Sequence, residues 1–183
     1  MKDQGFLEEI IIAGFGGQGV LSAGMILAYA GMLEGKNVAW LPSYGPEMRG
    51  GTANCNVVLS DDPVGSPVVS QADTLIVMNG PSLDKFENHV RPGGIIIVNS
   101  SLIERKVSRK DVTAYYFPLN DAAAELGSAK AANIVLLGAY MALKGFPQKP
   151  AVLESFLKVF GEGKKKFLPI NEQALLKGQS LVN

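Results

Sequence analysis

The sequence contains a single cysteine and a single histidine among its 183 residues. Cys55 alone cannot form an internal disulfide, a paired-cysteine zinc site or the four-thiolate shell of an iron–sulfur cluster. His89 alone excludes a multi-histidine metal site and leaves one candidate for histidine acid–base catalysis. No metal site is therefore expected in this chain, and any redox metal must sit on another one.

Excess charge is also missing, because 17 Lys and Arg balance 17 Asp and Glu. A chain without a broad positive field is a poor partner for nucleic acid or an anionic membrane. Residues 10–33 carry no charge and are formally long enough to cross a bilayer, but glycines and Gln18 interrupt them. We expect a buried strand and a buried helix there rather than a membrane span. Low cysteine usage and the lack of a positive segment before this stretch predict a cytoplasmic protein.

The hydrophobic pattern predicts one α/β domain over residues 1–183, with three layers (α/β/α), a mostly parallel mixed sheet and a Rossmann-like glycine-rich first turn. Strands are expected at residues 9–13, 37–41, 52–60, 74–78, 94–98 and 112–117, and helices at 20–32, 82–90, 129–144, 151–160 and about 171–177. The first two strands and the helix between them have the usual length of a parallel βαβ unit. Alternating polar and apolar residues at 52–60 indicate the one antiparallel strand. Ser128 is the expected N-cap of the 129–144 helix.

A glycine-rich loop joins the first strand to the first helix. It consists of Gly14, Phe15, Gly16, Gly17, Gln18 and Gly19. Backbone N–H groups at such a helix start can bind an anion, and glycine lets the ligand approach closely. A dinucleotide site also requires an acidic residue at the end of the second strand, and Glu34 instead precedes that strand. The other interpretation, equally open, is that the glycines only allow the helix to pack tightly on the strand.

A second polar loop follows the second strand, and we expect it on the same side of the sheet as the first loop. Its candidate ligand-binding residues are Tyr44, Glu47, Arg49, Gly50 and Gly51. The Arg49 guanidinium could bind a carboxylate or phosphate, with Glu47 orienting it; the alternative is an exposed ion pair of little energetic value. Asn54 could line the same crevice, or it could face solvent on an edge strand.

Three further polar residues have structural interpretations. Asn133 interrupts an apolar helix and is expected to tie that helix to a loop. Cys55 alternates with apolar residues and is expected to be a core thiol. His89 follows a charged helix face and is expected to be solvated.

Five segments together resemble a known family. They are IIAGFGGQGV, SYGPEMRGGTANC, SPVVSQADTLIVMN, VRPGGIIIVNSS and AANIVLLGA, and in this order they are similar to the gamma subunit of 2-oxoacid:ferredoxin (acceptor) oxidoreductases over essentially the whole chain. The form of the second loop suggests the 2-oxoglutarate branch. The resemblance implies a cytoplasmic, heteromeric enzyme of the EC 1.2.7 type that oxidatively decarboxylates a 2-oxoacid to an acyl-CoA and passes electrons to ferredoxin.

The resemblance also implies which subunits hold the cofactors. Thiamine diphosphate is held by alpha and beta subunits, iron–sulfur clusters by beta and, where present, delta, and no cofactor by this chain alone. The chain would be inactive in isolation, with no catalytic residue of its own, and its two loops would form a wall of the composite active-site or coenzyme A cleft. Two other functions stay open at this point: a free-standing NAD(P)-dependent dehydrogenase and a purely structural interaction subunit.

Overall fold

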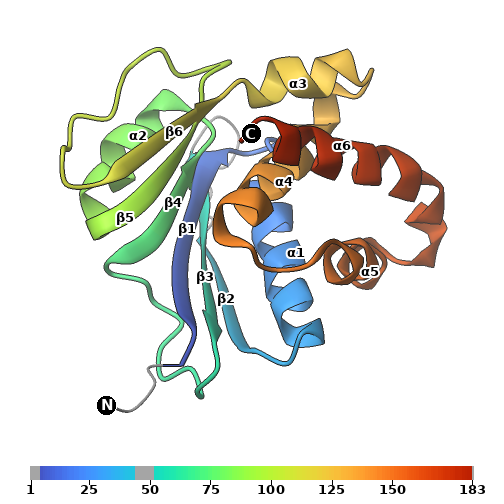
Figure 1. Ribbon diagram of the computed structural model, residues 1–183, viewed down its shortest axis with the longest axis horizontal. Coiled ribbons are helices and arrows are strands. Elements are labelled where there is room, and N and C mark those ends of the chain that lie inside the picture. The colour runs from blue at the N-terminus through green and yellow to red at the C-terminus, as the bar shows by residue number, and fades with distance from the viewer. Residues whose placement is uncertain (1–4, 44–51, 183) are drawn as a thin grey trace.

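A computed structural model describes residues 5–43 and 52–182. In this part of the chain six strands form one sheet in the order β2-β3-β1-β4-β5-β6 (Figure 1). The strands are β1 (Leu7–Phe15), β2 (Asn37–Ser43), β3 (Thr52–Ser60), β4 (Ala72–Val77), β5 (Val90–Asn99) and β6 (Thr113–Phe117). The helices are α1 (Val20–Leu33), α2 (Gly80–Phe86), α3 (Leu119–Glu125), α4 (Ala132–Lys144), α5 (Lys149–Phe160) and α6 (Leu168–Ser180).

The direction of the strands confirms the predicted mixed sheet. β1 pairs in parallel with β4, β4 with β5, and β5 with β6, whereas β3 is antiparallel to both of its neighbours. The predicted βαβ unit is wrong in one respect: β2 runs in the same direction as β1, but β3 lies between them. Insertion of β3 is possible because its alternating apolar face continues the buried face of β1 and β2 under α1.

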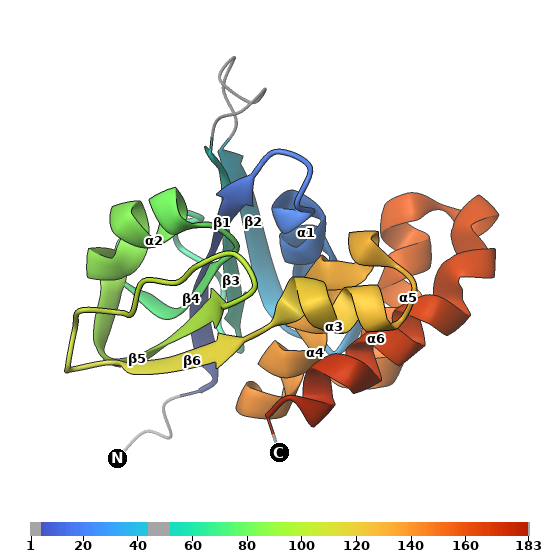
Figure 2. The ribbon, with the colours of Figure 1, turned by 90° about the horizontal axis from the view of Figure 1, so that it is seen from above.

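The sheet separates two hydrophobic cores, which confirms the three-layer class. Figure 2 shows α2 on one face of the sheet and α1, α3, α4, α5 and α6 on the other. Ile10 and Ile12 of β1 point into the larger core under α1 and α4, and Ile11 and Ala13 point into the smaller core under α2. Apolar residues on both sides of one strand explain its unbroken hydrophobic sequence.

Glycines set the distance between α4 and α6. A Cβ at Gly138 would lie 2.0 Å from the carbonyl oxygen of Leu175, and one at Gly178 would lie 1.9 Å from that of Val135. These separations are far inside van der Waals contact, so the two helices can pack this closely only because both positions lack a side chain.

Three expectations about helices need correction. Ser128 makes no side-chain cap, because residues Ala129–Ala131 form a 3-10 turn before α4 begins at Ala132. The last helix is longer than predicted, and α3 was not predicted at all. Short helices such as α3 depend on tertiary packing, here of Leu119 against the larger core, more than on local pattern.

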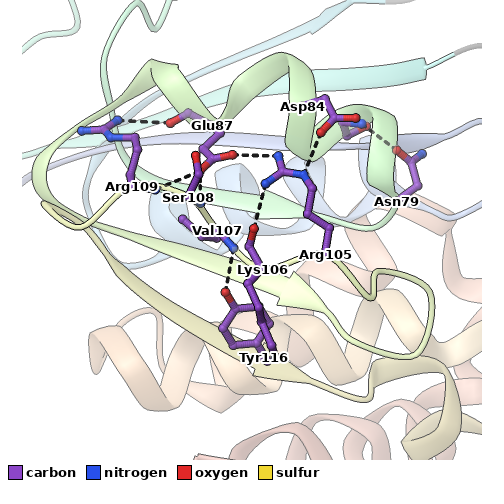
Figure 3. Close-up of polar contacts among 10 residues, drawn as sticks. Asn79, Asp84, Glu87, Arg105, Lys106, Val107, Ser108, Arg109 and Tyr116 are labelled. Carbon is purple, nitrogen blue, oxygen red and sulfur yellow. Dashed lines mark hydrogen bonds and ion pairs between the residues drawn. The ribbon is translucent and has the colours of Figure 1, made fainter.

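The segment between β5 and β6 is fastened to the end of α2 by one buried carboxylate. Glu87 lies in a 3-10 turn after α2 and is 5% exposed. Its oxygens accept hydrogen bonds from Arg105 Nη2 at 2.7 Å, Ser108 Oγ at 2.7 Å and the backbone N–H of Arg109 at 3.2 Å (Figure 3). Burial raises the pKa of Glu87, but these donors outweigh it and lower the pKa to about 2. The segment between β5 and β6 is thus held by a carboxylate that stays ionised.

None of the helices in the described residues has the length and apolar character needed to cross a bilayer.

Candidate functional site

The glycine-rich loop follows β1 at the carboxyl edge of the sheet, and its glycines meet different demands. Gly17 and Gly19 have φ angles of 93° and 75°, in the left-handed region that favours glycine. A Cβ at Gly14 would lie 2.9 Å from Met78 Cβ, and one at Gly19 would lie 2.5 Å from Asn133 Nδ2. A Cβ at Gly17 would meet no atom of the described residues within 4 Å. Packing therefore explains Gly14 and Gly19, whereas no packing contact in the described part of the chain explains Gly17.

No side chain of the described residues accepts a hydrogen bond from the backbone N–H groups in the first turn of α1. Its N-cap is Gly19, which has no side chain to accept a hydrogen bond from the first turn. A cavity of about 300 Å³ adjoins this turn. It is lined by Phe15, Gly16, Gly17, Gly19, Val20, Leu21, Ser22 and Ala53. Unsatisfied N–H groups at the positive end of a helix dipole are suited to a phosphate or carboxylate.

Gln18 was a predicted ligand-binding residue, but the loop itself engages its side chain. Gln18 Oε1 accepts a hydrogen bond from the Phe15 backbone N–H at 2.6 Å, and Nε2 donates to the Met78 carbonyl oxygen at 3.1 Å. Asn79, which caps α2 through the Ser82 N–H, also donates to Gln18 Oε1 at 3.4 Å. Gln18 thus holds the glycine loop against the end of β4.

A second cavity lies on the other side of the glycine loop, between two neighbouring strands whose following helices cover opposite faces of the sheet. The helix after β1 covers one face and the helix after β4 covers the other, which makes the crevice between these strands the topological switch point. The cavity measures about 190 Å³ and is lined by Gly17, Gln18, Met78, Asn120, Ala129, Lys130 and Ala132.

Asn120 lines this switch-point cavity, and Asn79 and Asn99 are hydrogen-bonded to side chains that line it; the sequence analysis named none of the three. Asn99 is fully buried at the end of β5 and donates from Nδ2 to Asn120 Oδ1 at 2.7 Å, while its own Oδ1 has no partner among the described residues. Asn79 and Asn99 follow directly on the apolar runs of two parallel strands. That repeated Asn at the end of a buried strand was the signal in the sequence.

The second predicted loop lies outside the described residues, with Tyr44, Glu47, Arg49, Gly50 and Gly51. Its described neighbours are placed at the same edge as the glycine loop: Thr52 is the register partner of Phe15, and Ser43 is that of Asn54. The residues on either side of the second loop therefore lie at the same edge of the sheet as the glycine loop.

Asn54 is separated from the glycine-loop cavity by the sheet itself. Ala53 lines that cavity, and successive side chains of a strand point to opposite faces, so Asn54 points to the α2 side. Its strand is not at the edge, because β2 covers it. The edge-strand alternative for Asn54 is therefore wrong.

The structural expectations for Asn133, Cys55 and His89 are confirmed. Asn133 Nδ2 donates to the Gly19 carbonyl oxygen at 3.3 Å and so ties α4 to the glycine loop. Cys55 is fully buried, and burial raises the pKa of its thiol to about 12, which makes it a poor nucleophile. His89 is exposed.

The sheet order argues against a dinucleotide site of the Rossmann type. In that fold the second strand lies beside the first and its acidic end reaches the ribose. Here β3 occupies that place in the opposite direction, and β2 is one strand further out. Among the described residues there is likewise no cluster of His, Cys, Asp and Glu that could hold a metal ion.

Known proteins that resemble this chain are oxidoreductase subunits. Ketoisovalerate oxidoreductase subunit VorA of Methanothermobacter thermautotrophicus is 44% identical over 170 residues, 93% of this chain and 35% of that protein. The chain thus spans about a third of the length of VorA. The 2-oxoglutarate synthase subunit KorC of Methanocaldococcus jannaschii is 36% identical over 159 residues, 85% of each chain.

Two solved structures share the fold. The keto/oxoacid ferredoxin oxidoreductase gamma subunit of Geobacter sulfurreducens is 32% identical, with a TM-score of 0.80 over 96% of this chain and 98% of that one. The 2-oxoglutarate:ferredoxin oxidoreductase of Magnetococcus marinus, solved with 2-oxoglutarate, coenzyme A and succinyl-CoA bound, has a TM-score of 0.87 and 26% identity over 96% of this chain and 31% of that one. A family model for pyruvate ferredoxin/flavodoxin oxidoreductase matches residues 9–181, and the chain belongs to this family.

Proposed function

We propose that this chain is the gamma-type component of a cytoplasmic 2-oxoacid:ferredoxin oxidoreductase and works only in complex with partner chains. The family match over residues 9–181 carries the proposal and supports a single domain of this type. With one cysteine and one histidine, the chain lacks the ligands for a cluster. Alpha and beta subunits, with a delta subunit where present, would supply thiamine diphosphate and the clusters that pass electrons to ferredoxin.

The contribution of this chain is a wall of the composite cleft that receives coenzyme A. The N–H groups at the start of α1, which no described side chain caps, and the cavity beside them favour an anionic ligand at the glycine loop. Gln18 would hold the loop in place through the end of β4. Arg49, oriented by Glu47, would bind an anionic group from the neighbouring segment.

The names of the relatives support 2-oxoglutarate as substrate, with a branched 2-oxoacid as the second candidate. KorC relatives match over most of their length, whereas the higher identity of 44% belongs to a ketoisovalerate oxidoreductase subunit. Partner chains hold the reacting carbon in either case, so this chain alone would not determine the substrate.

The test is purification of the native complex through a tag on this chain, followed by assay of ferredoxin reduction with coenzyme A and a panel of 2-oxoacids. We expect activity that requires coenzyme A and is highest with 2-oxoglutarate; highest activity with 2-oxoisovalerate would select the second candidate. Turnover by the isolated chain would contradict the proposal. In the complex, Arg49→Ala with unchanged kinetics for both 2-oxoacid and coenzyme A would remove the role of that residue.

Saturable binding of NADH or NADPH to the isolated chain, followed by Trp40 fluorescence, would instead support a dehydrogenase. A complex bound to coenzyme A in which neither loop touches the ligand would leave this chain a purely structural subunit.

A further inference from the structure

The outermost strand on one side of the sheet and the helix beside it contain no charged residue. β2 pairs with β3 and, in the described part of the chain, with no other strand. Figure 1 shows β2 at the rim of the sheet with α1 next to it. Neither β2 nor α1 contains Asp, Glu, Lys or Arg. Proteins usually protect an open strand edge with charged side chains or cover it, so this surface, which we call the β2 edge, is suited to pairing with another chain.

The side of α1 that faces away from the chain's core is also apolar. Met25, Tyr29 and Met32 lie on one row of the helix, four and three residues apart. Together with Val38 and Trp40 of β2 they line a cavity of about 210 Å³. Met32 is 49% exposed. A helix that is apolar on all sides is normally covered on all sides, and this row has only β2 beside it.

The opposite edge of the sheet differs, because a charged segment lies against it. β6 is the last strand on that side. In the segment between β5 and β6, the Val107 N–H donates to Tyr116 Oη at 2.9 Å (Figure 3), and Lys106 Nζ lies 4.0 Å from the centre of the same ring. Charged and bulky cover of this kind blocks the addition of a further strand. The β2 edge is therefore the better candidate for strand pairing between chains.

Two glycines place α1 above the boundary between β2 and β3. A Cβ at Gly24 would lie 2.4 Å from Cys55 Sγ of β3 and 3.1 Å from Trp40 Nε1 of β2. A Cβ at Gly31, two helical turns later, would lie 3.3 Å from Val38 Cγ1 of β2. The helix thus packs closely on both strands and lies about half a strand spacing inward from β2.

This position makes the β2 edge complementary to a second copy of itself. Neighbouring strands are about 4.8 Å apart, so two β2 strands that pair antiparallel around a two-fold axis each lie about 2.4 Å from that axis. Each α1 would then be about 4.8 Å from the axis, on the same face of the joined sheet. The two helices would be about 10 Å apart, which is close to the 8 to 10 Å of packed helices, so their apolar rows would meet.

We propose that the β2 edge is an interface between two copies of this chain, in which the sheets join through β2 and the Met25, Tyr29 and Met32 rows pack against each other. A second copy fits better than an acidic or basic partner, because the surface offers no counter-charge. A two-fold interface requires a surface that complements itself, as an open strand edge beside an apolar row does. The inference concerns self-association and does not depend on the proposed function.

The test is the oligomeric state of the full-length chain, measured by analytical ultracentrifugation. We expect a dimer that dissociates on dilution. Met32→Glu should raise its dissociation constant at least about a hundredfold, because the two-fold axis brings two unpaired carboxylates into one apolar contact. Leu41→Lys, at a strand position that is 37% exposed, should do the same. Leu102→Glu is the matched control: Leu102 is 51% exposed and follows β5 in the other half of the sheet.

Hydrogen exchange of the wild-type chain tests the strand pairing without any substitution. Dilution into the monomer range should speed exchange of the amides of β2, while those of β6, the other outermost strand, should not change. A chain that is monomeric at every concentration would overturn the inference. A dimer whose dissociation constant neither Met32→Glu nor Leu41→Lys changes would also overturn it, because the contact would then lie elsewhere.

The purified complex separates a second copy from a partner subunit as the occupant of the β2 edge. A chain that is monomeric alone, and whose Met32→Glu variant no longer assembles with its partners, would reject self-association and assign the edge to a partner subunit. Ferredoxin reduction by a complex that contains the monomeric chain would leave the proposed function standing. A dimer that responds to the substitutions as expected would support the inference even if the complex oxidised no 2-oxoacid.

Discussion

Replacing Glu87 by glutamine tests whether one buried carboxylate holds the segment between β5 and β6. The substitution keeps the shape of the side chain but removes its charge and turns one acceptor into a donor. Of its two ion-pair partners among the described residues, Arg105 would lose the buried one and keep Asp84, whose side chain is 67% exposed. Removing one member of a buried, hydrogen-bonded ion pair costs several kcal/mol, whereas an exposed pair contributes little.

The magnitude follows from the shifted pKa. The native value of about 2 lies below the ordinary value of 4.5 for a glutamate. At about 1.4 kcal/mol per pKa unit, the ionised carboxylate stabilises the native state by up to about 3 kcal/mol. Because the native pKa of Glu87 is lowered, this contribution is complete above pH 4.5 and disappears as the pH falls toward 2. Glu87→Gln should therefore lower the free energy of unfolding by about 2 to 3 kcal/mol at pH 7, with the difference from wild type shrinking below pH 4.5.

Urea denaturation of the wild type and the variant at several pH values between 7 and 2.5 measures this difference directly. Asp84→Asn is the matched control, because Asp84 contacts the same Arg105 guanidinium from an exposed position. It should cost less than about 1 kcal/mol. Equal costs for both variants, or a Glu87→Gln cost that does not change with pH, would refute the reasoning.

Further predictions concern the buried and glycine positions. Cys55, with its pKa raised to about 12, should not react with a thiol reagent at pH 8 until the chain is unfolded in urea, and fast labelling of the native chain would contradict its burial. Lys144→Met should cost about 3 kcal/mol at pH 7, because it leaves the buried Glu8 carboxylate unpaired. Burial already raises the pKa of Glu8, so protonation should restore part of the loss as the pH is lowered; a loss that grows toward acid would be inconsistent with this sign. Gly19→Ala should lower the melting temperature more than Gly17→Ala, since both have positive φ but only Gly19 would also clash; equal shifts measured by circular dichroism would contradict this.

The sequence was sufficient to predict β3 and its two faces. Residues 52–60 alternate in the way that the strand does, and Cys55 and Val57 are buried as that alternation requires. The pairing of β3 between β1 and β2 was not predictable in the same way, because strand order depends on contacts between distant segments. A continuous apolar strand such as β1 has suitable faces for several neighbours.

Part of the candidate site could likewise be predicted from the sequence, and part could not. The glycine loop could be placed from its spacing after a strand and before a helix, and the structure has it there. Lys130 and Asn133 could not be placed, because they reach the loop across more than a hundred residues of chain, as the Asn133 bond to Gly19 shows. Local pattern predicts what a segment forms, and tertiary packing decides which segments share a cavity.

The two interpretations of the glycine loop apply to different positions within it. Tight packing accounts for Gly14 and Gly19, whose missing side chains leave room for Met78 and Asn133. It does not account for Gly17, whose left-handed backbone lines two cavities and where a side chain would meet no described atom within 4 Å. Glycine adopts this left-handed conformation without strain, so at Gly17 the conformation of the turn, and no packing contact among the described residues, accounts for the glycine.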